Sequence, residues 1–311
     1  MPDHLPDGII NKQRGCLAFE AAYRLAKSAT MKIFLWLLLS TLLPSHLIAQ
    51  VLYSQKDIQV FNVVMSEAKK ANLSDSAIDR IVLFVGKQFM GIPYVGGVLD
   101  KPETENLVID LSQLDCVTYL ESTIALSVII KENKTQFGDF CNELKFIRYR
   151  NGVMNGYASR LHYFYDWINN NQQKGILGNI TENIGGRPFV KNIHFMTKNR
   201  TKYPHLKEDS SLVIVKKVEE ELSSMNKFYI PKEEIPLAEE KIRDGDLVAI
   251  ATTIDGMEVA HVGIAVHLST GLHLMHASSL NKKVEISEVS LSDMVRNKST
   301  YTGIIVSRLN M

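Results

Sequence analysis

Cysteine is scarce in this sequence, and neither sign of charge dominates it. Three cysteines among 311 residues are too few for a disulfide scaffold or a four-cysteine zinc cluster. The 35 lysines and arginines nearly cancel the 34 aspartates and glutamates, so the basic excess of a typical nucleic-acid-binding protein is absent. Internal repeats and low-complexity tracts are also lacking. With 45% hydrophobic residues, the composition indicates an ordinary globular protein.

Long hydrophobic runs are absent as well, and the most apolar stretch is short. Residues 33–43 follow Lys32 and end before Pro44, and Ala49 then offers a small residue for cleavage. This order of charged, apolar and small residues is typical of a secretory signal peptide. A helix that spans a bilayer needs about 20 apolar residues, so we expect no stable membrane span in the mature protein.

The signal divides the chain and predicts its location. We expect three segments: an upstream extension (1–30), a signal peptide (31–49) and a single mature domain (50–311). The mature domain is then exported, to the periplasm or the extracellular medium. The alternative is that the apolar run is retained as a membrane anchor because the long preceding segment blocks processing.

Helical and strand patterns occupy different parts of the mature region. Apolar residues recur at helical spacing in residues 57–71, 76–89 and 115–131, and the third segment is apolar on most sides, as in a buried helix. The stretch 132–240 is less regular and contains one further expected helix, 157–169. Short alternating runs then predict five strands: 247–252, 259–267, 272–279, 284–289 and 303–309. Helices followed by an antiparallel sheet indicate an α+β fold.

Cys116 follows Asp115 at the expected start of the third helix. The N-terminus of a helix carries partial positive charge and free N–H groups, which can lower the pKa of a thiol and stabilise an oxyanion. A thiol kept free outside the cell needs a reason, and catalysis is one. The structural alternative is a small buried cysteine that packs a helix end. Pairing with Cys141 in a disulfide is another alternative in an oxidising compartment.

A cysteine nucleophile needs a base, usually a histidine that a third group holds in place. The expected hairpin 259–279 carries His261 on its first strand, and His273 and His276 on its second. His273 and His276 are three residues apart, so they face opposite sides of the strand. If His267 lies opposite Leu272, His261 and His276 become diagonal neighbours on one face, whereas a register slip by one residue would favour His273.

The remaining histidines and a metal site are weaker hypotheses. His267 and His273 are more simply explained as half-buried residues of the sheet. Cys116, His261 and His276 could instead ligate zinc with one position open. No carboxylate lies beside these histidines at a short ligand spacing, and a thiol with two neutral histidines can hydrolyse an amide without metal. We therefore expect neither a metal nor a cofactor.

An ordered set of motifs resembles a known family. The motifs are Gly91-Ile-Pro-Tyr94, Leu114-Asp-Cys116, His261-Val-Gly-Ile264 and Leu274-Met-His-Ala277, with the segment 148–167 between them. This set is similar to the NlpC-type, papain-like cysteine peptidases of bacterial cell walls, and most similar to their N-acetylmuramoyl-L-alanine amidase-like family. The resemblance implies a nucleophile-bearing helix packed on an antiparallel sheet of about five strands, with additional helical segments. It also implies that 132–240 is an insertion specific to the family.

The resemblance implies a role for each residue of the expected triad. Cys116 would attack an amide carbonyl. His261 would activate the thiol as a general base and later protonate the leaving amine. His276 would orient His261, the task of the third group in such a triad.

Four further residues are expected to line the site and bind substrate: Tyr94, Asp115, Arg160 and His162. Tyr94 could equally be a core residue that anchors a loop, and Asp115 could be the helix cap. Arginine suits the carboxylates of peptidoglycan fragments because its guanidinium pairs them bidentately. Glu121, buried in the same helix as Cys116, needs a partner and is expected to pair with one of the arginines of 148–160.

These observations predict a secreted cysteine amidase that cleaves peptidoglycan or muropeptides, at the N-acetylmuramoyl-L-alanine bond by the family resemblance. One alternative is an endopeptidase of the same superfamily that cuts the D-glutamyl to diamino-acid link. Another is a cell-wall binding module without turnover. No nucleic-acid partner is expected.

Overall fold

The computed structural model describes residues 50–207 and 209–311. The expected upstream extension and signal peptide lie outside these residues. Within the described part of the chain, no helix is long and apolar enough to cross a membrane. The helices in this part are α2 (Gln55–Lys70), α3 (Ile78–Gln88), α4 (Cys116–Lys131), α5 (Phe137–Arg148), α6 (Phe164–Gln173), α7 (Phe195–Lys198), α8 (Asp209–Ser224), α9 (Ile235–Ala238) and α10 (Leu291–Arg296).

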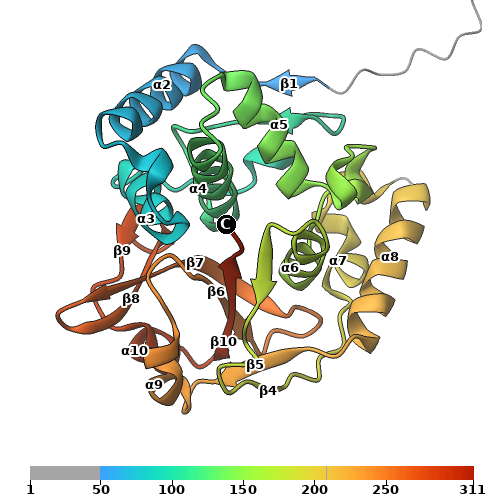
Figure 1. Cartoon of the computed structure of the whole chain (residues 1–311). Coiled ribbons are helices and arrows are strands. Elements are labelled where there is room, and N and C mark those ends of the chain that lie inside the picture. Colours follow the sequence, from blue (N-terminus) through green and yellow to red (C-terminus); the bar gives the residue numbers. More distant parts are fainter. Residues whose placement is uncertain (1–49, 208) are drawn as a thin grey trace, which may run out of the picture. The chain divides into compact units, whose positions relative to one another are not determined.

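An eight-stranded sheet, whose neighbouring strands run antiparallel, forms the centre of residues 50–311 (Figure 1). Its strand order is β4-β5-β10-β6-β7-β8-β9, and β3 also pairs with β10. The five strands predicted from the alternating pattern are all present: β6 (Leu247–Thr252), β7 (Val259–Leu268), β8 (Gly271–Ser278), β9 (Lys283–Ile286) and β10 (Tyr301–Leu309). The α+β class is therefore confirmed.

The expected size of the sheet was too small. Three short strands from the less regular stretch complete it: β3 (Leu177–Asn179), β4 (Arg187–Pro188) and β5 (Phe228–Pro231). Each has only two to four residues, too few for an alternating pattern to be recognised. A separate parallel pair, β1 (Val51–Leu52) and β2 (Leu107–Val108), lies outside this sheet. The stretch 132–240 thus supplies strands to the central sheet, and its origin as an insertion stays a prediction.

Alternate residues of the central strands point to opposite faces of the sheet, and each face packs into a different hydrophobic core. On β6, Leu247, Ala249 and Ala251 belong to the larger hydrophobic core, which also contains the apolar faces of α2 to α6. Val248 and Ile250, between them, belong to a smaller core with residues of α9 and α10. Helix α4 packs against β7 and β8 and is buried along nearly its whole length, because the sheet covers one side and α3 and α5 cover others.

One predicted helix begins later than its pattern suggested. Residues 157–159 form a short 3-10 turn, and Arg160 pairs with Tyr149 in an isolated β-bridge. Helix α6 starts only at Phe164. The buried carboxylate of Glu258 accepts a hydrogen bond from the Tyr165 N–H at 3.1 Å and so satisfies the first turn. This capping group lies more than 90 residues away in the sequence, so no local signal marks the start of the helix.

Candidate active site

Cys116 opens helix α4 because Asp115 caps it. The Asp115 carboxylate accepts a hydrogen bond from the Thr118 N–H at 2.8 Å, and the Thr118 hydroxyl accepts one from the Asp115 N–H at 2.9 Å. This capping box holds the first turn and leaves Cys116 at the end of the helix. The cap role expected for Asp115 is confirmed, and Asp115 also lines the cavity beside Cys116.

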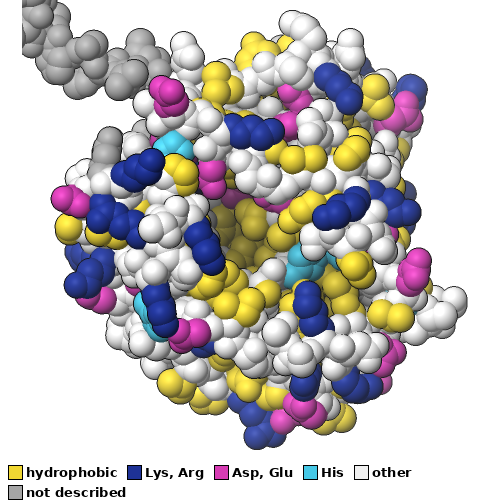
Figure 2. Space-filling view, turned by 180° about the vertical axis from the view of Figure 1, so that it is seen from behind, with side chains coloured by type: hydrophobic (Ala, Val, Ile, Leu, Met, Phe, Trp, Pro, Cys, Tyr) yellow, Lys and Arg dark blue, Asp and Glu magenta, His cyan; other side chains and the backbone are white. Residues whose placement is uncertain are grey.

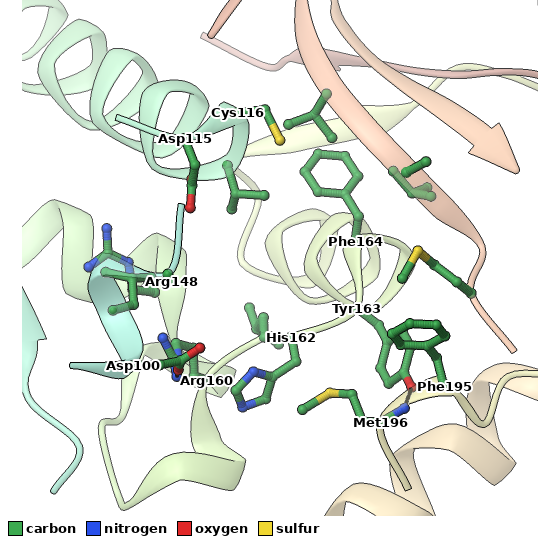
Figure 3. Close-up of a pocket in the computed structure, with 18 of the residues that line it drawn as sticks. Asp100, Asp115, Cys116, Arg148, Arg160, His162, Tyr163, Phe164, Phe195 and Met196 are labelled. Atoms are coloured by element: carbon green, nitrogen blue, oxygen red, sulfur yellow. Dashed lines mark hydrogen bonds and ion pairs between the residues drawn. The ribbon is translucent and has the colours of Figure 1, made fainter. Parts of the chain in front are cut away.

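A cavity of about 290 Å³ opens beside the sulfur of Cys116. Cys116 of α4, Asp115 just before it, and Arg160 and His162 from the segment before α6 line it (Figure 3). His261 of β7 lines it as well. In the space-filling view the hollow has a hydrophobic floor, a histidine at its edge, and lysines and arginines around its rim (Figure 2). The fold therefore brings together five residues that the sequence analysis selected from three separate segments.

The two selected histidines are hydrogen-bonded to each other. His261 Nε2 lies 2.7 Å from His276 Nδ1, and the ring planes are perpendicular, with centroids 4.8 Å apart. The register between β7 and β8 pairs His267 with Leu272, which is the condition under which His261 and His276 share a face. His273 instead contacts Thr270 and the Ser287 carbonyl, so it is a sheet residue away from the cavity.

Both histidines are buried and strongly disfavour protonation. Burial lowers the pKa of His261 to about 3, and the neighbouring His276 and Lys298 act in the same direction. Burial lowers the pKa of His276 to about 4, against the carboxylate of Glu285, which raises it. At neutral pH the pair is therefore uncharged, and an uncharged imidazole can accept a proton.

The pKa of the Cys116 thiol differs from the expectation. Burial raises the pKa of Cys116 to about 12, and the Asp115 carboxylate raises it further. The backbone N–H groups of Val262, Cys116 and Val117 act in the opposite direction but are outweighed. The expectation that the helix N-terminus would lower this pKa was therefore wrong, because loss of solvent and the charged cap outweigh the N–H groups. The resting site holds a neutral thiol beside neutral imidazoles.

Tyr94 lies near the thiol but outside the cavity lining. Its N–H donates to the Lys282 carbonyl at 2.9 Å, and the Lys282 ammonium lies 5.7 Å from the centre of the Tyr94 ring. Burial and the charges of Cys116 and Asp115 raise the pKa of its hydroxyl to about 12. Tyr94 thus anchors the loop before α4 against the turn between β8 and β9, and its contact with substrate stays a prediction.

The Arg160 side chain lies on the cavity wall opposite Cys116 (Figure 3). Its side chain is buried, pairs with Asp100 at 2.5 Å and with Glu105 at 3.4 Å, and lies over the Tyr157 ring at 5.0 Å (Figure 3). The contact with Glu105 is made by Arg160 Nε, which forms an ion pair there but no well-aligned hydrogen bond among the described residues. His162 Nε2 lies 2.8 Å from the Tyr157 carbonyl oxygen, and burial together with Arg160 lowers the pKa of its imidazole, which keeps it neutral.

The other two arginines of this segment form ion pairs with carboxylates, and Arg148 also lines the cavity (Figure 3). Arg148 pairs with Glu121 at 2.7 Å inside the core, which confirms the expected partner of Glu121, and Trp167 donates to the same carboxylate at 3.1 Å. Arg150 forms two hydrogen bonds with Asp166 on α6. These ion pairs connect the end of α5 and the residues after it to α4 and α6.

The sequence analysis missed several residues of the cavity wall. Aromatic side chains from three segments line it: Tyr157, Tyr163, Phe164, Phe195 and Tyr203. Asp100 and Glu258 contribute carboxylates. Phe195 and Tyr203 come from a stretch with no regular pattern, so nothing in their local sequence indicates the site. Cys116 and Cys141 are both free, and the described residues contain no cluster suited to a metal ion.

Comparison with known proteins assigns the family. The N-acetylmuramoyl-L-alanine amidase-like (AmiA-like) family matches residues 84–304. An N-acetylmuramoyl-L-alanine amidase from Bacteroides uniformis is 35% identical, with a TM-score of 0.72 over 75% of this chain and 99% of its own. A Bacteroides fragilis protein named as a candidate xylanase is 34% identical, with a TM-score of 0.69 over 72% of this chain and 98% of its own.

A more distant structure shares the fold. A protein from Legionella pneumophila is 20% identical, with a TM-score of 0.62 over 81% of this chain and 95% of its own. No curated protein matches the chain. The family match and the relatives at 34–35% identity show that this chain belongs to the N-acetylmuramoyl-L-alanine amidase-like family.

Proposed function

We propose that this protein is a cysteine amidase of the NlpC-type, papain-like superfamily, which hydrolyses the N-acetylmuramoyl-L-alanine bond of peptidoglycan fragments. The observation that carries the proposal is the hydrogen bond between His261 Nε2 and His276 Nδ1, on a strand that lines the same cavity as Cys116. With His261 Nε2 engaged, Nδ1 is the nitrogen left to accept the thiol proton. The family and the Bacteroides uniformis amidase support the choice of bond.

Acylation begins from the neutral pair. As the Cys116 sulfur attacks the carbonyl carbon, its proton passes to His261 Nδ1, so no free thiolate has to exist beforehand. The backbone N–H groups at the start of α4 stabilise the oxyanion of the tetrahedral intermediate. The carbon–nitrogen bond then breaks, His261 returns its proton to the leaving amine, and a thioester on Cys116 remains.

Deacylation uses the same residues in reverse. Water gives a proton to His261 Nδ1 and attacks the thioester carbon. The carbon–sulfur bond breaks, the Cys116 sulfur recovers the proton, and the acid is released. Throughout both steps His276 accepts the hydrogen bond from His261 Nε2 and so maintains the ring orientation that the proton transfers need.

The cavity wall fits a fragment that carries rings and carboxylates. Arg160 lines the cavity with a guanidinium, and the aromatic residues Tyr157, Phe164 and Phe195 offer flat apolar surfaces. Carboxylates of a stem peptide would pair with the Arg160 guanidinium, and the apolar faces of a sugar would lie on the aromatic rings. His162 and Asp115 would supply further polar contacts.

The test is mass spectrometry of muropeptides after incubation with the purified protein, beside a Cys116→Ala control. We expect a free peptide that begins with L-alanine and a sugar without peptide, both absent from the control. Cleavage between D-glutamate and the diamino acid would replace the amidase by the endopeptidase. Absence of product from a set of fragments would overturn the enzymatic proposal in favour of a binding module.

We further propose that the protein is exported through its signal peptide and acts in the periplasm. The order of charged, apolar and small residues in 31–49 supports this, although these residues lie outside the described structure. Cell fractionation of the full chain, with N-terminal sequencing of the recovered protein, tests it. A mature N-terminus near Gln50 in the periplasmic fraction is expected, and an uncleaved cytoplasmic protein would contradict it.

A further inference from the structure

A second cavity lies on the other side of the histidine pair. Its volume is about 280 Å³, and it is lined by His261 and His276 together with polar residues of the following turns. These include Asn281, Glu285, Glu288 and Lys298. His261 therefore lies between two cavities, one containing the thiol and one containing Glu285.

Glu285 lies directly opposite His276 in the sheet. The register of β8 and β9 pairs the two residues, and side chains of directly opposed residues lie on the same face about 5 Å apart at Cβ. Glu285 is buried, and its Oε1 accepts a hydrogen bond from Asn281 Nδ2 at 2.7 Å. Its charge acts on the His276 ring in the direction that favours the protonated imidazole.

The proposed chemistry requires a negative charge near His261, which a pair of neutral histidines does not supply. When His261 takes the thiol proton, a positive charge forms in a buried site, and a neutral His276 compensates it only weakly. A carboxylate beside the second ring supplies the missing negative charge, as a carboxylate does behind the histidine of other triads. Glu288 borders the same cavity but is exposed, and the nearby Lys298 disfavours the positive charge on His261.

We propose that Glu285 is a positioning residue of this site, which completes the sequence Cys116–His261–His276–Glu285 and stabilises the imidazolium form of His261 through His276. The inference rests on the proposed role of Cys116 and His261. Asn281 in turn holds the Glu285 carboxylate toward β8. Glu285 itself does not contact the substrate.

The test follows the reactivity of Cys116 and needs no substrate. The rate of Cys116 alkylation by iodoacetamide is measured from pH 6 to 11 in the wild-type chain and in Glu285→Gln, by mass spectrometry of the Cys116 peptide. Glutamine keeps the size of the side chain and can still accept from Asn281, so the fold is retained. We expect alkylation at pH 7 to be about three- to tenfold slower in Glu285→Gln, because less thiolate–imidazolium pair forms.

The pH dependence separates positioning from structure. Above pH 10 hydroxide removes the thiol proton without help from His261, so the two rates should converge. Glu288→Gln removes a charge from the same cavity and should behave as wild type, and Glu285→Asp should recover part of the rate. The role of Glu285 would be overturned if wild type and Glu285→Gln were alkylated at equal rates at pH 7. It would also be overturned if Glu285→Gln were slower by the same factor at pH 7 and at pH 11.

A matched kinetic experiment links the residue to turnover. With a muropeptide that the wild-type protein cleaves, Glu285→Gln should lower kcat about tenfold and leave KM unchanged. A change in KM alone would contradict the proposal. If the wild-type protein cleaves no muropeptide, the amidase proposal fails, whereas the alkylation experiment still decides the role of Glu285.

Discussion

Cys116 and His261 line a cavity in which burial favours the uncharged form of both side chains. In the proposed reaction, a thiol with a pKa raised to about 12 and an imidazole with a pKa lowered to about 3 would exchange a proton only when bond formation to the substrate makes the transfer favourable. The proposed mechanism therefore relies on general base catalysis during attack, and less on a thiolate that exists beforehand.

This state of the thiol predicts a pH profile. Iodoacetamide should alkylate Cys116 slowly at pH 7, through the small population of the thiolate–imidazolium pair, and the rate should rise about tenfold for each pH unit once hydroxide supplies most of the thiolate at higher pH. Peptide mass spectrometry against time measures this rate. A rate that is already high at pH 7 and does not rise further toward pH 11 would show that the resting site holds mainly a thiolate–imidazolium pair.

Arg160 permits a separate prediction about substrate binding. In Arg160→Gln we expect KM for muropeptides to rise about tenfold with a small change in kcat, since a lost charged hydrogen bond is worth about 1.5–3 kcal/mol. Steady-state kinetics measures the split. Arg150→Gln is the matched control, because Arg150 pairs with Asp166 outside this cavity. Equal effects of both substitutions would contradict a binding role for Arg160.

At the scale of the element, Asp115 at the start of α4 has two effects, one on the stability of the helix and one on the Cys116 thiol. Asp115 caps the helix through Thr118, and its charge also raises the pKa of the neighbouring thiol. The cap needs only an oxygen that accepts a hydrogen bond, whereas the effect on the thiol needs the negative charge. These two contributions can therefore be separated by substitution.

Asparagine and alanine at position 115 should give different results. Asp115→Asn should keep the stability within about 0.5 kcal/mol and speed alkylation of Cys116 at pH 8, because the cap remains while the charge is lost. Asp115→Ala should lower the free energy of unfolding by about 1 kcal/mol, because the cap is lost as well. Urea unfolding and iodoacetamide kinetics measure the two effects. Slower alkylation in Asp115→Asn would contradict the electrostatic role.

The start of α6 shows how elements far apart in sequence define the cavity. Helix-forming residues begin near Tyr157, but the helix begins at Phe164, where Glu258 accepts the N–H of Tyr165. Arg160 and His162 therefore stay outside the helix and line the cavity. Arg160 and His162 could be selected from the sequence as site residues. The backbone conformation that places them depended on Glu258, from the connection between β6 and β7.

At the scale of the whole molecule, Glu258 makes stability depend on pH. Burial raises the pKa of this carboxyl to about 7, so the folded chain holds its proton more tightly than the unfolded chain. The resulting stabilisation is complete below the ordinary pKa of about 4.5 and is lost as the pH rises through about 7. The buried histidines act in the opposite sense at lower pH, because they must be deprotonated to fold.

Comparison with Glu258→Gln isolates this contribution. Glutamine resembles the protonated acid, so the variant should gain stability relative to wild type as the pH rises from 4.5 to 7, by up to about 3 kcal/mol. Urea unfolding at several pH values measures the difference, in which the effects of His261 and His276 cancel. A difference that is constant with pH, or that shrinks as the pH rises, would contradict the raised pKa.

The sequence by itself determined the parts that depend on local patterns. Alternating residues marked the five long strands, and helical spacing marked α2, α3 and α4. The hairpin register stayed conditional, and only the structure pairs His267 with Leu272. Cys116, His261 and His276 could be chosen because catalysis requires particular residue types. The motifs also carried the resemblance to the family that the comparisons show.

Only the tertiary structure decided the rest, because it depends on contacts between distant segments. The short strands β3 to β5 exist through pairing with β10 and with each other, and the aromatic wall of the cavity is assembled from separate loops. The raised pKa of Cys116 and the proximity of Glu285 to His276 likewise arise from burial and strand pairing. Burial and long-range pairing are properties of the packed chain, and no single segment of the sequence contains them.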